Sequence, residues 1–385
     1  MTESTTSGSA SSGPAVSEPE RRIVSGESWR EFCDRLKSAG DPIFAADAAS
    51  DPFSRAEGTR YLTRLVRAAL ETFVEFADPM APVLRRAVHE TVKMGADNPD
   101  NWYENAPVHG DCVYRLHGTR GTVPYLSIAT QVGHYGQGGG MPPAGFLEAK
   151  DLVIAGDGSL ELILSRDRRP GNWLPLGDGY GTLIIRQTFL DRSKETRAEL
   201  TLERIEGPAA PPALTADAID SGLASAASLV GACAMIFPGW ADGFRAHANA
   251  LPRFDPDLSR MFGGDPNIAY YHSYWELADD EALVIETTPP DCEYWNFQLN
   301  NYWMESLDYR YHRITLNKAS AKLEADGSLR IVVTARNPGA HVDNWLETAG
   351  HTFGTMCFRW VRAEVNPVPE TRVVKLADLE RLPQR

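Results

Sequence analysis

The sequence has few cysteines, no long hydrophobic run and no excess of basic residues. Its 385 residues include five cysteines, scattered singly at Cys33, Cys112, Cys233, Cys292 and Cys357. This pattern excludes a cysteine-rich zinc module and is typical of a reducing compartment. No apolar stretch reaches the length of a membrane span, and the N-terminus lacks the apolar core of a signal peptide. We therefore expect a cytoplasmic protein that spans no membrane.

The charge balance excludes another class of partner. The chain has 38 basic and 52 acidic residues, a formal net charge of −14. Nucleic acids and anionic membranes are bound by clustered lysine and arginine, so neither is an expected partner. The Gly-x-Ser-x-Gly elbow, the Rossmann fingerprint and the His-Glu-x-x-His motif are also missing, which removes support for a serine hydrolase, a dinucleotide enzyme or a zincin. No cofactor and no metal is predicted.

The most informative feature that is present is an internal repeat. Asp157-Gly158-Ser159 opens one apolar run and Asp326-Gly327-Ser328 opens another. In each copy an Asn-Trp-Leu triplet follows, and then a Gly-Thr strand that ends in arginine. The same number of positions separates Tyr125 from Tyr294 and the two aspartates from each other, and insertions fall only in a loop. Asp-Gly before such a run predicts a tight turn into a strand.

The repeat predicts a mainly β protein, made of two related β-sandwich units in tandem with helical segments before and between them. The sheets are expected to meet through the faces that contain Trp295, Phe297, Leu299, Ile331, Val333, Ile163 and Leu183. Both Asn-Trp-Leu triplets are interpreted as structural corners, since a feature present in both copies serves the shared fold. Helical spacing of apolar residues predicts helices at 28–38, 57–77, 82–94, 215–236 and 239–249. The expected divisions are a disordered tail at 1–22, a helical lead-in at 23–100, a first β-unit at 101–207, a helical insert at 208–279, a second β-unit at 280–365 and a C-terminal tail at 366–385.

Several segments resemble a bacterial family catalogued as "domain of unknown function 1214". They are Asn98-Pro99-Asp100-Asn101, Tyr114-Arg115-Leu116 and Arg359-Trp360, together with the two Asp-Gly-Ser strands and both corners. The resemblance extends from about 57 to 365. It implies a β-sandwich fold with duplicated units and helical additions, but it implies no reaction and no catalytic residues.

Positions that differ between the copies are therefore the first candidates for function. One strand of the second copy has Asn296, Gln298 and Asn300 on the same face. Three amides are costly to bury without partners, so they either face solvent, form hydrogen bonds between the units or line a polar cleft.

The loop after that strand is rich in aromatic and charged residues. It contains Trp303, Tyr309 and Tyr311, with Glu305 and Asp308 between and beside them. Aromatic faces with carboxylates suit the recognition of a sugar or another ring-containing molecule. The alternative is a well-packed end of the sandwich with an aromatic rim.

Two histidines of the second copy are candidates for proton transfer. His341 and Asp343 would project from one side of an extended segment, and His351 follows the same corner. A histidine held by an aspartate is the usual arrangement for proton transfer near neutral pH, although the pair could also hold a divalent metal with a third ligand. The loop at His134 and Tyr135 in the first copy is either a flexible connection or a lid that contacts a ligand.

We hypothesise an enzyme that uses acid–base chemistry, without a nucleotide cofactor, on a neutral ring-containing small molecule such as a terpenoid, steroid or sugar derivative. Its reaction would be that of a lyase, isomerase or hydrolase. The predicted catalytic residues are His341, Asp343, His351, Glu305 and Asp308. The predicted substrate-binding residues are Trp303, Tyr309, Tyr311, Asn296, Gln298, Asn300, His134 and Tyr135. The alternative is a non-catalytic protein that binds a carbohydrate or another small molecule, and a homo-oligomer interface at the same cleft is also open.

Overall fold

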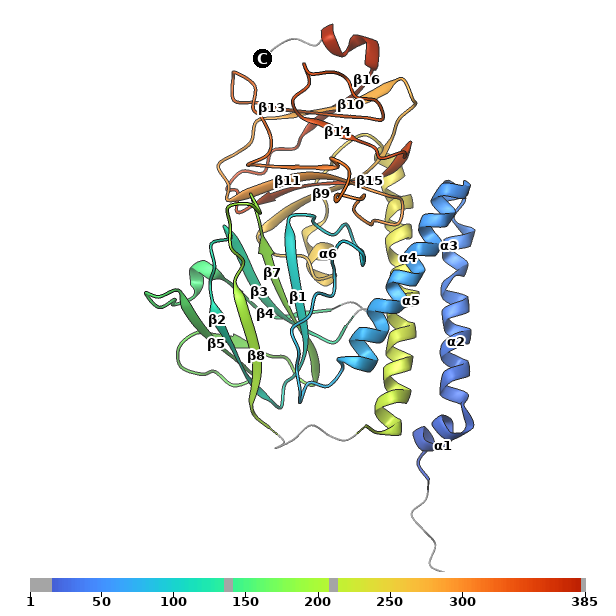
Figure 1. The fold of residues 1–385 in the computed structure, drawn as a ribbon, viewed down its shortest axis with the longest axis vertical. Helices are drawn as coiled ribbons and strands as arrows, with labels where there is room; N and C mark the ends of the chain where they lie inside the picture. The colour runs from blue at the N-terminus through green and yellow to red at the C-terminus, as the bar shows by residue number, and fades with distance from the viewer. Residues whose placement is uncertain (1–15, 135–140, 208–213, 382–385) are drawn as a thin grey trace, which may run out of the picture.

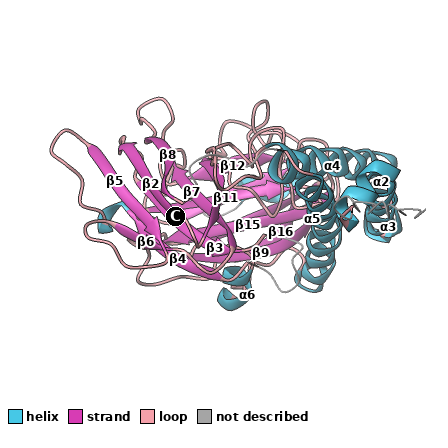
Figure 2. Ribbon diagram, turned by 90° about the horizontal axis from the view of Figure 1, so that it is seen from below, coloured by secondary structure: helices cyan, strands magenta, loops and turns pink. Residues whose placement is uncertain are grey.

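The computed structural model describes residues 16–134, 141–207 and 214–381. Two β-rich units are stacked along the long axis of the molecule, and the long helices run along one side of it (Figure 1). Seen from below, the helices lie at one end of the β-rich body (Figure 2). The predicted fold class, mainly β with two tandem units and helices before and between them, is confirmed.

Each β-unit is a sandwich of two four-stranded sheets, and the strand order is the same in both units. The strands of the first unit are β1 (Asn101–His109), β2 (Val113–Thr119), β3 (Tyr125–Val132), β4 (Pro143–Glu148), β5 (Ser159–Ser165), β6 (Trp173–Pro175), β7 (Tyr180–Thr188) and β8 (Glu199–Glu206). Those of the second are β9 (Ile268–Glu276), β10 (Glu281–Thr287), β11 (Tyr294–Asn300), β12 (Thr315–Asn317), β13 (Leu329–Thr334), β14 (Trp345–Glu347), β15 (Phe353–Val361) and β16 (Glu370–Lys375). The first unit pairs β1-β7-β3-β4 and β6-β5-β2-β8, and the second pairs β9-β15-β11-β12 and β14-β13-β10-β16. Every strand thus has a counterpart in the other unit, as expected of a duplication.

The two aspartate–glycine turns fold alike. Gly158 and Gly327 have φ of 83° and 82°, in the left-handed region that glycine adopts without strain. The Asp157 and Asp326 side chains each accept a hydrogen bond, at 2.9 Å, from the backbone N–H two residues further on. The same local chemistry therefore starts β5 in one unit and β13 in the other.

The two Asn-Trp-Leu corners also share one geometry. The Asn172 amide donates to two backbone carbonyls at 2.9 Å, and the Asn344 amide donates to two at 2.6 and 2.9 Å. Trp173 and Trp345 are half-buried, and each indole N–H donates to a nearby oxygen of the preceding strand or its loop. The corners tie loop backbone to the sheet, so their contacts are structural.

Each sandwich has a hydrophobic core of its own. The residues predicted for the sheet interfaces that lie in these cores are Trp295, Phe297, Leu299, Ile331 and Val333 in the second unit and Leu183 in the first. Ile163 was also predicted to lie there and does not. Its neighbours Leu162 and Leu164 are fully buried, so the alternation of β5 turns Ile163 to the outer face.

The helices form a third layer. They are α1 (Glu18–Ser25), α2 (Glu27–Ala39), α3 (Asp41–Ala45), α4 (Pro52–Leu70), a π-helical turn (Glu71–Glu75), α5 (Ala216–Phe244) and α6 (Pro256–Met261). Apolar side chains of α2, α4 and α5 join Tyr274, Trp303 and Cys357 of the second unit in one buried cluster. The helical layer is therefore packed against the second β-unit rather than forming a separate body.

Two of the predicted helices are wrong. The segment 82–94 is not helical, because Arg85 pairs with Asn105 of β1 in an antiparallel bridge and its valines favour extended backbone. The predicted helices at 215–236 and 239–249 are largely one helix, α5, because the helix continues through Pro238. Proline costs a helix one backbone hydrogen bond, and α5 accommodates Pro238 at a buried position.

The ends of two predicted segments also differ from the structure. Helix α1 lies partly within the predicted tail at 1–22, because Ser17 and Glu20 form a capping box that starts it. The strands of the second unit run from Ile268 to Lys375, beyond the predicted limits of 280 and 365. The aromatic-rich β9 had been assigned to the insert, and it pairs with β15 along its whole length.

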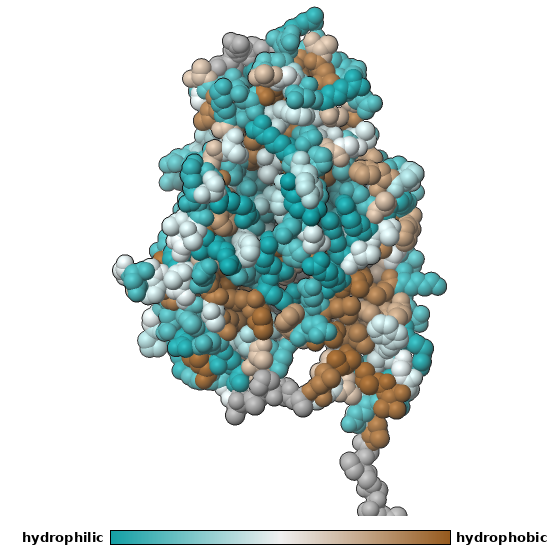
Figure 3. All heavy atoms as spheres, viewed as in Figure 1, coloured by the Kyte–Doolittle hydropathy of each residue, from teal (hydrophilic) through white to brown (hydrophobic). Residues whose placement is uncertain are grey.

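Helix α5 with the turn that follows, Ala216–His247, is long and apolar enough to cross a membrane by length and composition. However, 56% of its apolar window is buried within the protein, as in the core helix of a globular fold. Apolar residues gather at the lower end of the helical layer, around the start of α5, whereas much of the visible surface above is polar (Figure 3).

Candidate functional site

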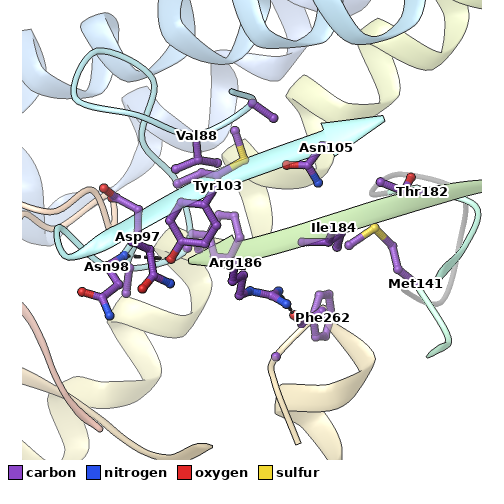
Figure 4. Close-up of a pocket in the computed structure, with 18 of the residues that line it drawn as sticks. Val88, Asp97, Asn98, Tyr103, Asn105, Met141, Thr182, Ile184, Arg186 and Phe262 are labelled. Atoms are coloured by element: carbon purple, nitrogen blue, oxygen red, sulfur yellow. Dashed lines mark hydrogen bonds between the residues drawn. The ribbon is translucent and has the colours of Figure 1, made fainter. Parts of the chain in front are cut away.

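A cavity of about 230 Å³ lies where the two β-units and the helical layer meet. One wall comes from β1 and β7 of the first unit, another from β9 and β15 of the second, and the rest from α4, α5 and the segments near 85–98 and 254–264. Figure 4 shows Asp97, Asn98 and Tyr103 close together, with Thr182 further along β7 and Met141 on a neighbouring segment. We call this space the central cavity.

The two β-unit walls of the central cavity are built from equivalent positions of the repeat. Arg186 of β7 and Arg359 of β15 occupy the same position of the repeated Gly-Thr strand, and both line the cavity. Tyr103 pairs in register with Arg186, and Tyr270 pairs in register with Arg359. Each arginine thus has a neighbouring tyrosine on the first strand of its own unit.

The units also exchange hydrogen bonds reciprocally. The Tyr103 hydroxyl accepts from Asn98 N at 3.1 Å, and the Tyr270 hydroxyl accepts from Asp265 N at 3.2 Å, so Asn98 and Asp265 are equivalent positions. Tyr125 of the first unit donates to the Asp265 carboxylate at 2.9 Å. Its counterpart Tyr294 accepts from the Asn98 amide at 3.1 Å. These contacts fix the two units relative to each other around the central cavity.

The guanidinium of Arg359 forms hydrogen bonds with amide side chains of β11. Its side chain is 4% exposed, and Nη1 donates to Asn296 Oδ1 at 3.2 Å and Gln298 Oε1 at 2.6 Å. Nη2 donates to the carbonyl of Ala96. The amide of Gln298 donates in turn to Asn300 Oδ1 at 2.6 Å, so the three predicted amides form one buried row. The row is also tied to the segment before β1, because the Asn296 amide donates to Asn98 Oδ1 at 3.2 Å.

Three buried polar atoms on the cavity wall have no hydrogen-bond partner among the residues that the structure describes. They are Arg85 Nη1, Asn101 Oδ1 and His272 Nδ1. Burial, with the charge of Arg359 acting in the same direction, lowers the pKa of His272 to about 3, so its ring is neutral near pH 7. Native proteins satisfy the great majority of buried polar groups, so three around one cavity make it the first candidate for a functional site.

The side of the cavity formed by α5 and the 254–262 segment is aromatic. Trp240 of α5 lies 5.3 Å from Phe254 and 5.1 Å from Phe262 between ring centroids. Phe237 packs edge-on against the same indole at 5.7 Å. The central cavity therefore combines an aromatic lining with a small number of polar groups, as small-molecule sites generally do.

Comparison with known proteins gives the family of the chain. Residues 278–364 match a family model described as a protein of unknown function, DUF1214. The crystal structure of an uncharacterised protein from Burkholderia cenocepacia is 53% identical, with a TM-score of 0.91, over 93% of this chain and 99% of that one. The chain belongs to the DUF1214 family. A crystal structure of a Vibrio parahaemolyticus protein, 12% identical over 83% of this chain and 98% of that one with a TM-score of 0.50, shares the fold. No curated protein matches.

A second, more polar pocket of about 140 Å³ in this DUF1214 protein contains three of the predicted catalytic residues. His351 Nε2 lies 2.9 Å from Glu57 Oε2 of α4, and Glu305 pairs with Arg64 of the same helix. Burial opposes protonation of His351, but the Glu57 carboxylate outweighs it and raises the pKa of the imidazole. The third residue is Asp308, where a hydrogen bond from Arg310 lowers the pKa to about 2. We call this space the polar pocket.

The remaining catalytic candidates lie elsewhere. His341 and Asp343 are exposed in a surface turn, and Asp343 forms an ion pair with Lys322 at 2.9 Å. The structure therefore brings Glu305, Asp308 and His351 together and leaves the His341–Asp343 segment outside both pockets. Among the described residues, no group of three or more His, Cys, Asp or Glu side chains is arranged to hold a metal ion.

The predicted aromatic residues are dispersed. Trp303 is fully buried against α4, and its indole donates to the carbonyl of Ser54 at 3.0 Å. Tyr309 lies 4.5 Å from the ammonium of Lys93, whereas Tyr311 is 77% exposed. None of the three lines either pocket.

Of the two predicted loop residues, His134 lines the central cavity, 4.2 Å from the ring of Phe73, and Tyr135 lies outside the described residues.

The arginines and tyrosines of the central cavity were not among the predicted site residues. Both arginines occupy the same repeat position, and Asn98 and Arg359 belong to the segments that carry the family resemblance. These two features of the sequence could have indicated the residues, but positions shared by the two copies had been assigned to the fold alone.

Proposed function

We propose that this DUF1214 protein binds a small, largely apolar, ring-containing molecule in the central cavity. The observation that carries the proposal is a set of three buried polar atoms around the cavity that have no hydrogen-bond partner among the described residues, Arg85 Nη1, Asn101 Oδ1 and His272 Nδ1. Leaving such atoms unpaired costs about 1–3 kcal/mol each, which a bound ligand with matching groups would recover.

The lining supports the chemical class of this ligand. The aromatic residues of α5 and of the 254–262 segment offer ring faces, and aliphatic groups such as Val88 and Ile184 complete the apolar surface. A volume of about 230 Å³ is modest beside the roughly 300–1,000 Å³ of sites for drug-sized molecules. A one- or two-ring compound is therefore the expected size.

Ligand-detected NMR with a set of neutral one- and two-ring compounds, 2-naphthol among them, tests the proposal. The variant Val88→Trp fills the central cavity, and Val153→Trp makes the same change at a side chain that is 79% exposed. We expect binding to the unaltered chain and to Val153→Trp, and loss of binding in Val88→Trp. Equal binding to all three proteins, or binding to none, would contradict the proposal.

The acid–base enzyme inferred from the sequence is a second proposal, supported by the 2.9 Å contact between His351 and Glu57 beside Glu305 in the polar pocket. A histidine held by a carboxylate can transfer protons near neutral pH. Compounds that bind would be incubated with the unaltered chain and with His351→Gln, with His312→Gln as the control from the same pocket. Product formed at an unchanged rate by His351→Gln would exclude this histidine as the catalyst.

A further inference from the structure

The central cavity has more positive than negative charge on its walls. Arg85, Arg186 and Arg359 line it, and Asp97 is the one carboxylate among its lining residues in the described part of the chain. Burial raises the pKa of Asp97, which weakens its negative charge further. Its carboxylate is also engaged elsewhere, since it accepts from Ser306 N at 2.9 Å and Ser306 Oγ at 2.8 Å.

The two equivalent arginines differ in what faces them. Asp265 lies close enough to Arg186 for the guanidinium charge to oppose the rise that burial causes in the pKa of the Asp265 carboxyl. The position equivalent to Asp265 in the first unit is Asn98, which has no charge. The repeat therefore provides a carboxylate for Arg186 and a neutral amide at the matching place for Arg359.

The hydrogen-bond partners of Arg359 are all neutral. They are the side-chain oxygens of Asn296 and Gln298 and the carbonyl of Ala96. Arg359 forms no close ion pair with any described residue, although its side chain is only 4% exposed. Its charge acts on the carboxyl groups of Asp97 and Asp100, but burial raises the pKa of both and so weakens their negative charge. A buried charge without a counter-charge is costly, and proteins normally pair it or use it to bind an ion or ligand of opposite sign.

Arg85 adds a second donor on the same cavity. Its Nη1 forms a long ion pair with Glu71 at 3.6 Å but makes no hydrogen bond within the described residues. A guanidinium presents N–H groups in a planar fork that matches a carboxylate. With an aromatic lining, and with three arginines and one carboxyl group among the lining residues, a monoanion with an apolar body is the matching ligand.

We propose, building on the binding function above, that the ligand of the central cavity is a carboxylic acid with an aromatic or aliphatic body, and that its carboxylate is held by Arg359. This differs from the neutral ligand inferred from the sequence. Arg85 supplies a further N–H, and the amide row of β11 is the support that fixes the Arg359 guanidinium in place.

Calorimetric titration of the full chain with matched acids and amides tests the inference. The probes are 2-naphthoate with 2-naphthamide, and octanoate with octanamide, which differ in charge but hardly in shape. We expect each acid to bind at least about tenfold more tightly than its amide, because charge-assisted hydrogen bonds add roughly that much. Arg310→Gln, at an arginine paired with Asp308 outside the cavity, should keep this ratio.

Two variants assign the preference to Arg359. Arg359→Gln should reduce the ratio of acid to amide affinity to within about twofold. Asn98→Asp keeps Arg359 and introduces the carboxylate that the second unit has at Asp265, and it should reduce the ratio in the same way. The Asn98→Asp variant provides the test if Arg359→Gln does not fold.

Acids that bind no better than their amides, or not at all, would overturn the inference. The inference would also be overturned if Arg359→Gln or Asn98→Asp folds and still binds the acids more tightly than the amides. If the amides bind with the same affinity as the acids, the carboxylate assignment fails while binding in the central cavity stands. If the neutral ring compounds also fail to bind, the proposed function fails as well.

Discussion

The buried imidazole of His272 gives a quantitative prediction about stability. His272 lines the central cavity on β9, and the position equivalent to it in the first unit is Asn105 on β1. The substitution His272→Asn therefore introduces the residue that the same fold already accepts in its other copy. It removes a titratable group without leaving a large cavity.

The direction in which stability changes with pH follows from the pKa of His272, which burial lowers from 6.5 to about 3. The unfolded chain takes up a proton as the pH falls below 6.5, whereas the folded protein does not until about pH 3. The stability associated with the neutral ring is thus fully present above pH 6.5 and is lost as the pH falls. Each pH unit in this window costs at most about 1.4 kcal/mol. Between pH 7.5 and pH 5 the loss amounts to about 2 kcal/mol.

Urea unfolding at pH 7.5, 6.5, 5.5 and 5 measures this loss in both proteins. We expect the free energy of unfolding to fall by about 2 kcal/mol more in the unaltered chain than in His272→Asn, since all other titrating groups are common to the two. Parallel pH dependences would refute the reasoning. An NMR titration that places the His272 pKa near 6.5 in the folded protein would refute it independently.

Three further changes have defined outcomes. Tyr294→Phe removes the 2.7 Å hydrogen bond from the buried Tyr294 to the half-buried Asp100 and should lower the free energy of unfolding by about 2 kcal/mol in urea unfolding. Gly58→Ala places a methyl group 2.6 Å from the Trp303 ring and should cost about 2–3 kcal/mol, seen as a lower melting temperature. His351 has a raised pKa, so its contribution is present below pH 6.5 and is lost as the pH rises through the folded-state pKa. His351→Gln should remove that loss in melting curves from pH 6 to 9.

The part of the fold that follows from local chemistry could be predicted. Asp157-Gly158 and Asp326-Gly327 form the same turn because glycine accepts positive φ and the aspartate accepts from the backbone two residues on. These interactions lie within a few residues of sequence, so the pattern reports them directly. The missed features, such as the extended segment at Arg85, depend on a partner strand that only the folded chain provides.

The candidate site could be predicted only in part, because it is formed where separate segments meet. Glu305 and His351 lie in the polar pocket, where they contact Arg64 and Glu57 of α4. Helical spacing in the sequence predicts such a helix, but it does not predict where the helix packs. The central cavity depends even more on packing, since its walls come from both units and from the helical layer.

The candidate residues of the central cavity include positions that the two copies share. Arg186 and Arg359 occupy one repeat position and both line the cavity, because the two units turn equivalent sheets toward each other. A duplicated position can therefore serve the fold and a ligand together. The two arginines differ in a neighbouring repeat position. This position is Asp265 in the second unit, near Arg186, and Asn98 in the first unit. Arg359 has only neutral hydrogen-bond partners, which is why we propose that an acid binds at this arginine and not at Arg186.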